Sequence, residues 1–139
     1  MIICGFPGVG KSTAANRVKG VVDLESTPFK KDFETYVNVA LHMSKNGYTP
    51  LVSSHEEMRE HLLTSGVKFK IVIPKLTDKE IYMGNYRCRG NTDEFIKLLD
   101  VNFDKWIRDI MNDDRLRDKL VILDTKKYLR DIIEYLIDQ

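Results

Sequence analysis

The residues with the clearest chemistry lie near the start of the chain, where glycines, one lysine and two hydroxyl side chains follow a short apolar run. Their spacing fits the pattern GxxxxGK[ST], which binds phosphate where it joins a strand to a helix. The segment consists of Gly5, Phe6, Pro7, Gly8, Val9, Gly10, Lys11, Ser12 and Thr13. The alternative is a glycine turn that ends in Lys-Ser by chance. The apolar run before the segment and the helix-forming run after it favour the phosphate-binding loop.

The spacing within this loop has a physical reason. Glycines adopt backbone conformations that a Cβ forbids, so successive N–H groups can turn into one concavity. The amino end of the following helix faces the same concavity and favours an anion there. We therefore expect Lys11 to reach the β- and γ-phosphates of a nucleoside triphosphate, and the Ser12 hydroxyl to ligate Mg²⁺.

Size and charge bound the rest of the chain. The 139 residues predict a single domain spanning 1–139, and the 42% hydrophobic residues suffice for a core. Lys and Arg number 22 against 21 Asp and Glu, a net charge of +1. This net charge is too small to indicate binding of duplex nucleic acid, although it is compatible with a local basic groove.

The cysteines and the short apolar run at the start of the sequence bear on the cellular compartment of the protein. Cys4 and Cys88 lack the spacing of metal ligands, and we expect both to be reduced thiols. The first apolar run stops at Gly5, too early for a signal peptide or a membrane span. The prediction is a cytoplasmic protein without a membrane partner. The three histidines have no i, i+4 pairing, so we expect no zinc site.

Short apolar runs alternate with helical segments, a pattern typical of a parallel sheet covered by helices. The expected strands are 2–4, 21–24, 51–53, 69–73 and 120–123, and the expected helices are 11–19, 28–45, 56–64, 78–88, 92–111 and 127–137. Thr77 with Glu80 predicts a capping box, and Asn91 with Glu94 predicts a similar helix start. Trp106 lies on an apolar helical stripe, which favours a place in the core. The fold class is α/β, with a five-stranded parallel sheet in a three-layer α/β/α domain.

Two carboxylates follow the second expected strand. Asp23 and Glu25 stand where a parallel sheet collects ligands, at the carboxyl end of a strand. A carboxylate there could orient an acceptor hydroxyl, bind a sugar or hold Mg²⁺ through water. In the alternative, both side chains only cap the next helix.

Most of the chain resembles the nucleoside and nucleotide kinases among the phosphate-loop proteins, and its closest local match is to the adenylate- and guanylate-kinase arrangement. The segments that carry the resemblance are Ile71–Pro74, Leu76–Ile81 and Tyr86–Ile96. The chain is also similar to small bacteriophage-encoded kinase-like proteins. It has no Asp-x-x-Gly and no Asn-Lys-x-Asp, which small GTPases need, and it is short for a motor or AAA-type ATPase.

The resemblance implies an arginine-bearing lid over about 84–94. Arg87 and Arg89 would close over the phosphates of ATP, since the planar guanidinium donates two hydrogen bonds to phosphate oxygens. The alternative is that both arginines only complement a helix carboxyl end and face water.

The resemblance also implies an acceptor region over about 26–49. Arg59 stands where nucleotide kinases often grip an acceptor phosphate, and Tyr36 is a candidate contact for a base. Arg59 could instead be a surface arginine paired with a glutamate. Many relatives carry an acidic residue at the end of the third strand, where this chain has Ser53. That departure gives Ser12 and Asp23 more weight as metal ligands.

Together these features predict ATP-dependent phosphoryl transfer to a nucleotide, with a (deoxy)nucleoside monophosphate as the favoured acceptor and Mg²⁺ as the cofactor. Lys11, Asp23, Arg87 and Arg89 would be the catalytic residues of a monomer or weak dimer. One alternative acceptor is a nucleoside, or a 5′-hydroxyl or modified base in nucleic acid. Another alternative is a nucleotide-binding regulatory module whose chemistry has decayed.

Overall fold

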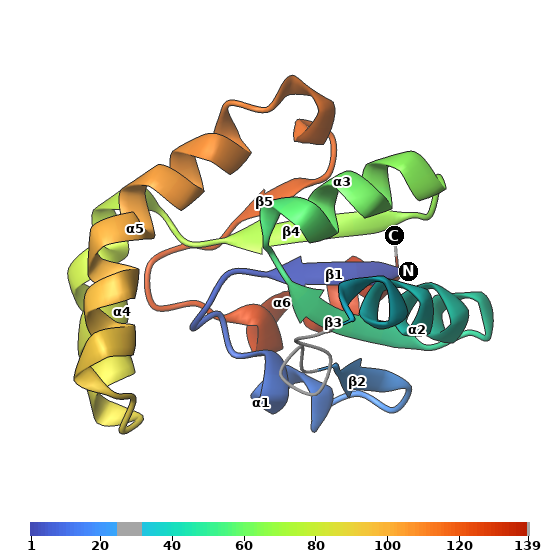
Figure 1. The fold of residues 1–139 in the computed structure, drawn as a ribbon. Coiled ribbons are helices and arrows are strands. Elements are labelled where there is room, and N and C mark those ends of the chain that lie inside the picture. Colours follow the sequence, from blue (N-terminus) through green and yellow to red (C-terminus); the bar gives the residue numbers. More distant parts are fainter. Residues whose placement is uncertain (25–31, 139) are drawn as a thin grey trace.

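The computed structural model describes residues 1–24 and 32–138 and contains one sheet of five parallel strands (Figure 1). The strands are β1 (Ile2–Gly5), β2 (Val21–Asp23), β3 (Thr49–Ser53), β4 (Phe69–Ile73) and β5 (Leu120–Ile122), in the spatial order β2-β3-β1-β4-β5. This confirms the predicted α/β class and the five-stranded parallel sheet. Strand β1 is central, so its carboxyl end delivers the phosphate loop to the middle of the sheet edge.

The described residues also form six α-helices. They are α1 (Lys11–Ala15), α2 (Phe33–Lys45), α3 (Glu56–Ser65), α4 (Lys79–Cys88), α5 (Asp93–Met111) and α6 (Leu129–Ile137), joined by the short turns η2 (Leu76–Asp78) and η3 (Asp114–Leu116). In Figure 1, α2 and α3 cover the near face of the sheet, and α6 lies behind it beside α1, an arrangement compatible with three layers. Helices α4 and α5 pack on each other beyond the carboxyl ends of the strands.

The core follows from the apolar strands. Ile2, Ile3 and Cys4 of β1 have no exposed surface, as expected for a strand covered on both faces. Burial raises the pKa of the Cys4 thiol to about 12, so this thiol stays protonated at neutral pH. Both cysteines are free. None of the helices in the described part of the chain has the length and apolar character needed to cross a membrane.

Helix boundaries differ from the sequence prediction at several places. Helix α1 ends at Ala15 rather than at residue 19, and a turn through Gly20 (φ 89°) leads into β2. The Thr77–Glu80 capping box is absent, because Thr77 lies within η2 and α4 begins at Lys79 without a side-chain cap.

Helix α5 is capped by Thr92, whose hydroxyl accepts a hydrogen bond from the Phe95 amide at 3.2 Å, whereas the predicted cap Asn91 donates to the Tyr86 carbonyl. Helix α2 begins after Asp32, whose side chain accepts from the Thr35 amide at 3.1 Å. The predicted start of that helix at residue 28 lies outside the described residues.

Candidate functional site

The backbone of the phosphate loop is held by its carbonyl groups. The Pro7 carbonyl accepts from the Tyr86 hydroxyl at 2.6 Å, and the Val9 carbonyl accepts from the Leu129 amide at 2.9 Å. Gly8 and Gly10 have φ values of 92° and 90°, in the left-handed region that favours glycine. Among the described residues, no backbone carbonyl accepts from the amides of Gly8 or Gly10. These N–H groups are therefore available to an anion.

Gly8 is required for a second reason, which is close packing. A Cβ at this position would lie 2.7 Å from a ring carbon of Tyr86 and 3.1 Å from one of Tyr82. Both tyrosines belong to α4 and are buried. The loop thus rests directly on α4, and its shape depends on that helix.

Lys11 lies in the centre of the loop. Its Nζ donates to the Gly5 carbonyl at 3.1 Å. Burial lowers the pKa of Lys11, the nearby cation of Arg89 lowers it further, and the carboxylate of Asp23 opposes both. Asp23 and Arg89 are thus near enough to Lys11 to influence its pKa in opposite directions.

The two predicted lid arginines lie on different faces of α4. Arg89 lines a cavity beside the phosphate loop together with Asn85 and Cys88 of the same helix. At 3.6 residues per turn, Arg87 lies about 200° around the helix from Asn85. Both arginines are exposed, but Arg87 does not line this cavity. Only one of the two arginines is therefore positioned toward the phosphate loop.

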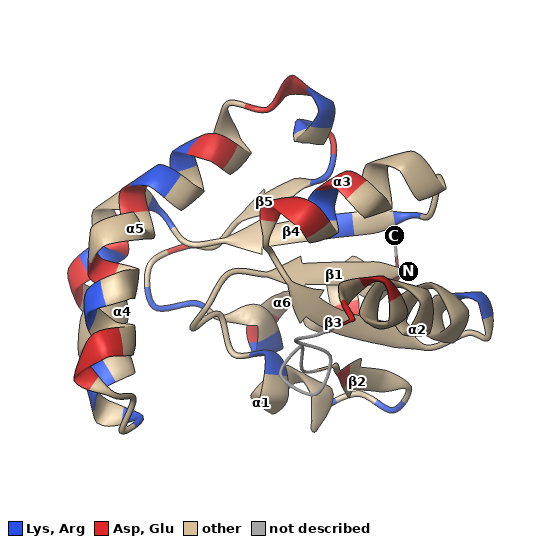
Figure 2. Cartoon of the chain, viewed as in Figure 1, with Lys and Arg blue, Asp and Glu red and all other residues tan. Residues whose placement is uncertain are grey.

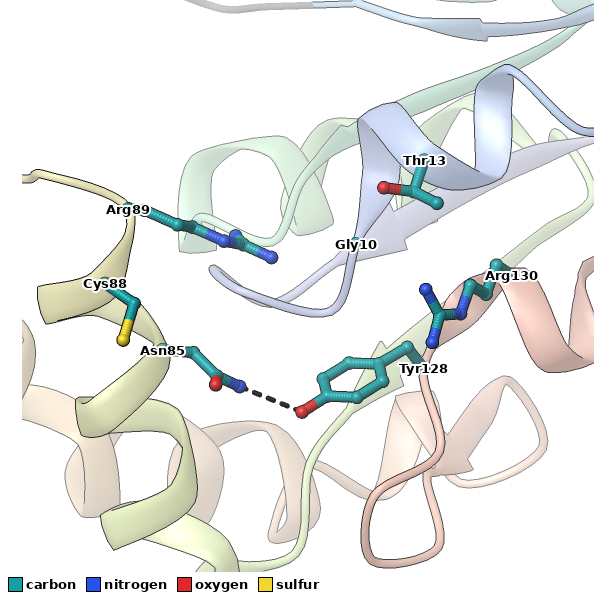
Figure 3. Close-up of a pocket in the computed structure, with 7 residues that line it drawn as sticks. All are labelled: Gly10, Thr13, Asn85, Cys88, Arg89, Tyr128 and Arg130. Carbon is teal, nitrogen blue, oxygen red and sulfur yellow. Dashed lines mark hydrogen bonds between the residues drawn. The ribbon is translucent and has the colours of Figure 1, made fainter.

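The cavity beside the loop, here called the donor cavity, has a volume of about 290 Å³. It is lined by Gly10, Thr13, Asn85, Cys88, Arg89, Tyr128 and Arg130 (Figure 3). The volume is near the lower end of the range for small-molecule sites. The lining combines the end of the phosphate loop, the end of α4 and the start of α6, so that a ligand could contact all three.

Strand register fixes the carboxyl ends next to the loop. Ser53 pairs with Gly5 across β3 and β1, and its Oγ lies 3.3 Å from Nδ1 of His55. Within residues 1–24 and 32–138, no group of three or more His, Cys, Asp or Glu side chains could hold a metal ion. A hydroxyl from Ser12 and a carboxylate from Asp23 still suit Mg²⁺ that arrives with a nucleotide, because Mg²⁺ keeps its waters and phosphate ligands.

Tyr36 has a different role from the predicted contact with a base. Its side chain has no exposed surface, and its hydroxyl donates to the Leu24 carbonyl at 3.0 Å and accepts from the Ser53 amide at 3.2 Å. It thus links the ends of β2 and β3 from within the core. Glu25, the other acceptor-side prediction on this flank, lies outside the described residues.

A second cavity lies on the other flank of the loop and encloses about 140 Å³. Its lining consists of Pro7, Ser54, His55, Glu56, Arg59, Lys105, Trp106 and Asp109. Four of these residues, Glu56, Arg59, Lys105 and Asp109, also line an outer cleft of about 570 Å³. Trp106 is half-buried, with its ring centroid 6.5 Å from that of Phe6, so it belongs partly to the core and partly to this cavity.

Arg59 gives the second cavity a buried cation. Its side chain is only 9% exposed, and Nη1 donates to the Ser54 carbonyl at 2.7 Å. Within the described parts of the chain, no carboxylate oxygen lies within 4 Å of its guanidinium nitrogens. Partial burial lowers the pKa of His55, and the cations of Lys11 and Arg59 lower it further, which favours a neutral imidazole beside the loop.

Several lining residues were not predicted. Asn85, Tyr128 and Arg130 approach the loop from segments that carry no motif of their own. Helical spacing from Arg89 could have indicated Asn85, since residues four apart share a helix face. Lys105 and Asp109 could have been found in the same way from Trp106.

No family model matches the chain, and no match is found among curated proteins.

Proposed function

We propose that the protein is a phosphate-loop kinase that transfers the γ-phosphoryl group of ATP to a nucleotide, and that the acceptor is a (deoxy)nucleoside monophosphate. The observation that carries this proposal is the position of the phosphate loop between two cavities, each with an arginine in its lining. We further propose a cytoplasmic monomer or weak dimer that works with Mg²⁺.

The donor side supports the first half of the proposal. Phosphoryl transfer needs mainly positioning and stabilisation of the charge on the transferred group. The free amides of the loop would hold the phosphate oxygens, and Lys11 would exchange the Gly5 carbonyl for a β- or γ-oxygen. Arg89 would offset the charge that develops in the transition state. Mg²⁺, held by Ser12 and through water by Asp23, would neutralise charge on the donor phosphates.

The acceptor side rests on Arg59. A buried cation is costly unless an anion or several hydrogen bonds compensate it. Among the described residues, its hydrogen-bond partner is the neutral Ser54 carbonyl, so an acceptor phosphate would supply an anion in direct contact with the guanidinium. Pro7 and Trp106 offer an apolar wall beside it. This assignment moves the acceptor from the α2 flank, where the sequence suggested it, to the flank formed by α3 and α5.

The nucleic-acid alternative has less support. The outer cleft carries acidic side chains beside its basic ones, whereas a long nucleic acid needs a mainly basic track. Figure 2 shows acidic and basic residues interspersed along α4 and α5 rather than a basic stripe.

A nucleotide-binding module without turnover is the second candidate function. The observation in its favour is Ser53, which stands beside Gly5 where a carboxylate would help to hold Mg²⁺. Such a module would bind ATP and would not consume it.

The test is ADP release from Mg²⁺-ATP with a panel of ribo- and deoxynucleosides, their monophosphates and a short oligonucleotide. We expect turnover with a monophosphate, and a loss of about 100-fold or more in kcat/KM for Lys11→Ala. Arg59→Met should raise the KM of the acceptor and leave that of ATP unchanged. Lys19→Ala, an exposed lysine after α1, is the matched control. ATP binding with silence across the panel would favour the module instead.

A further inference from the structure

The donor cavity contains one hydrogen-bonded pair of uncharged side chains. Asn85 of α4 and Tyr128, which directly precedes α6, are 43 residues apart in the chain, and Nδ2 of Asn85 donates to the Tyr128 hydroxyl at 2.8 Å (Figure 3). Both side chains are half-buried and line the cavity. The cavity thus has a polar element that none of the phosphate-binding roles uses.

This hydrogen bond leaves one donor and one acceptor available. The Tyr128 oxygen accepts from Asn85, so its own hydrogen is free to donate. Asn85 uses an N–H of Nδ2 for this bond, so its Oδ1 remains able to accept another hydrogen bond. Among the described residues, neither Oδ1 of Asn85 nor the Tyr128 hydroxyl hydrogen has another partner. The two groups are joined by that hydrogen bond, and both residues line the donor cavity.

An adenine base presents the complementary pair. Its exocyclic amino group donates beside a ring nitrogen that accepts, whereas guanine has an oxo group at the position of that amino group. Oδ1 of Asn85 would accept from the amino group, and the Tyr128 hydroxyl would donate to the ring nitrogen. Guanine in the same pose would place its oxo group against Oδ1 of Asn85. Both atoms are acceptors, so no hydrogen bond could form between them.

The rest of the cavity suits a planar base joined to phosphates. The Arg130 guanidinium lies over the Tyr128 ring, 5.8 Å from its centroid, and guanidinium planes stack well on bases. Gly10 and Thr13 line the same cavity, so a base near Tyr128 would be continuous with phosphates in the loop.

We propose that Asn85 and Tyr128 select the base of the phosphoryl donor and favour adenine over guanine nucleotides. This inference rests on the proposed function, because it assigns the donor cavity to a nucleoside triphosphate.

The experiment measures equilibrium binding of Mg²⁺-ATP, Mg²⁺-GTP and inorganic tripolyphosphate by calorimetry. The tripolyphosphate has no base and reports on the phosphate loop alone. We expect ATP to bind about tenfold more tightly than GTP. Tyr128→Phe keeps the ring and removes only the hydroxyl, so ATP affinity should fall about 3- to 10-fold, with the ATP-to-GTP ratio moving toward one and tripolyphosphate binding unchanged. Asn85→Leu should have the same effect by removing the acceptor.

Tyr135→Phe, an exposed tyrosine on α6, is the matched control and should leave all three affinities unchanged. Equal binding of ATP and GTP, a preference for GTP, or a ratio unaffected by Tyr128→Phe would overturn the base-selecting role and leave the phosphate loop intact. Failure of tripolyphosphate and both nucleotides to bind would instead contradict the proposed function.

Discussion

At the scale of single residues, the phosphate loop depends on what lies beneath it as much as on its own glycines. Gly8 faces the ring of Tyr86, whose hydroxyl also holds the Pro7 carbonyl. One aromatic side chain therefore sets both the shape of the loop and the space allowed at Gly8. The motif alone predicts that a glycine is needed here. It does not predict the packing against Tyr86, because Tyr86 lies 79 residues from Pro7 in the chain.

Gly8→Ala should disrupt this contact. The new Cβ would meet the Tyr86 ring at 2.7 Å and would occupy a left-handed backbone conformation. We expect a loss of about 1–3 kcal/mol in the free energy of unfolding, together with weaker ATP binding. Gly84→Ala is the control, since nothing lies within 4 Å of its Cβ and it should stabilise helix α4 by up to about 1 kcal/mol. Denaturant unfolding of both variants would decide, and an unaltered Gly8→Ala protein would contradict the packing argument.

The burial of individual side chains was only partly predictable from the sequence. Tyr36 shares a helical face with Phe33, Val37 and Ala40, so the apolar spacing already indicated a buried position. This buried position gives no support to a contact between Tyr36 and a base. Arg59 stays a candidate acceptor ligand, and its place in a cavity could not be foreseen because the same cavity is lined by Lys105, Trp106 and Asp109 of helix α5.

At the scale of elements, helix α4 separates the two arginines that a linear motif treats alike. The sequence Arg-Cys-Arg-Gly places both arginines near the end of the helix. The position of Asn85 and Cys88 in the cavity lining shows which face of the helix lies toward the loop. Helical periodicity was available from the sequence, but the orientation of the helix around its axis was not.

Arg89→Ala should therefore lower kcat by about 100-fold, because Arg89 lies toward the transferred phosphoryl group in the proposed mechanism. Arg87→Ala removes the same charge from the opposite face and should stay within about twofold of the wild type. Steady-state kinetics with the acceptor identified in the panel would measure both. Equal losses in the two variants would contradict the assignment to one helix face.

Helix α3 is tied to η3 by Arg115. Its Nη1 and Nη2 donate to Glu60 at 3.0 and 2.6 Å, and the same guanidinium contacts Asp113 at 2.8 Å. Hydrogen bonds from Arg115 lower the pKa of both carboxyl groups. A lowered folded-state pKa contributes stability above the unfolded value of about 4, and this contribution is lost as the pH falls through the folded-state values.

Arg115→Gln should consequently destabilise the protein at pH 7 and have little effect near pH 3. Urea unfolding at the two pH values would measure the difference. Arg117→Gln removes the same charge from an exposed pair with Asp114 and serves as the control. A destabilisation that is equal at both pH values would show that packing of the Arg115 stem, rather than its ion pairs, holds η3.

At the scale of the whole molecule, the parallel sheet was the most predictable feature. Five apolar runs gave five strands with small changes at their ends, because a strand buried on both faces needs a nearly continuous apolar sequence. The phosphate loop followed from its position after β1. The two cavities were not predictable in the same way, since each is assembled from segments far apart in the chain.

The helix pair α4–α5 contributes to both cavities at once. Asn85, Cys88 and Arg89 of α4 face the donor side, and Lys105, Trp106 and Asp109 of α5 face the other. An ion pair of 2.9 Å between Lys79 and Asp100 joins the two helices. A ligand that moved the two helices together from one cavity would therefore change the lining of the other cavity as well. Thermodynamic reciprocity then requires that a ligand in one cavity and a ligand in the other change each other's affinity by one common factor.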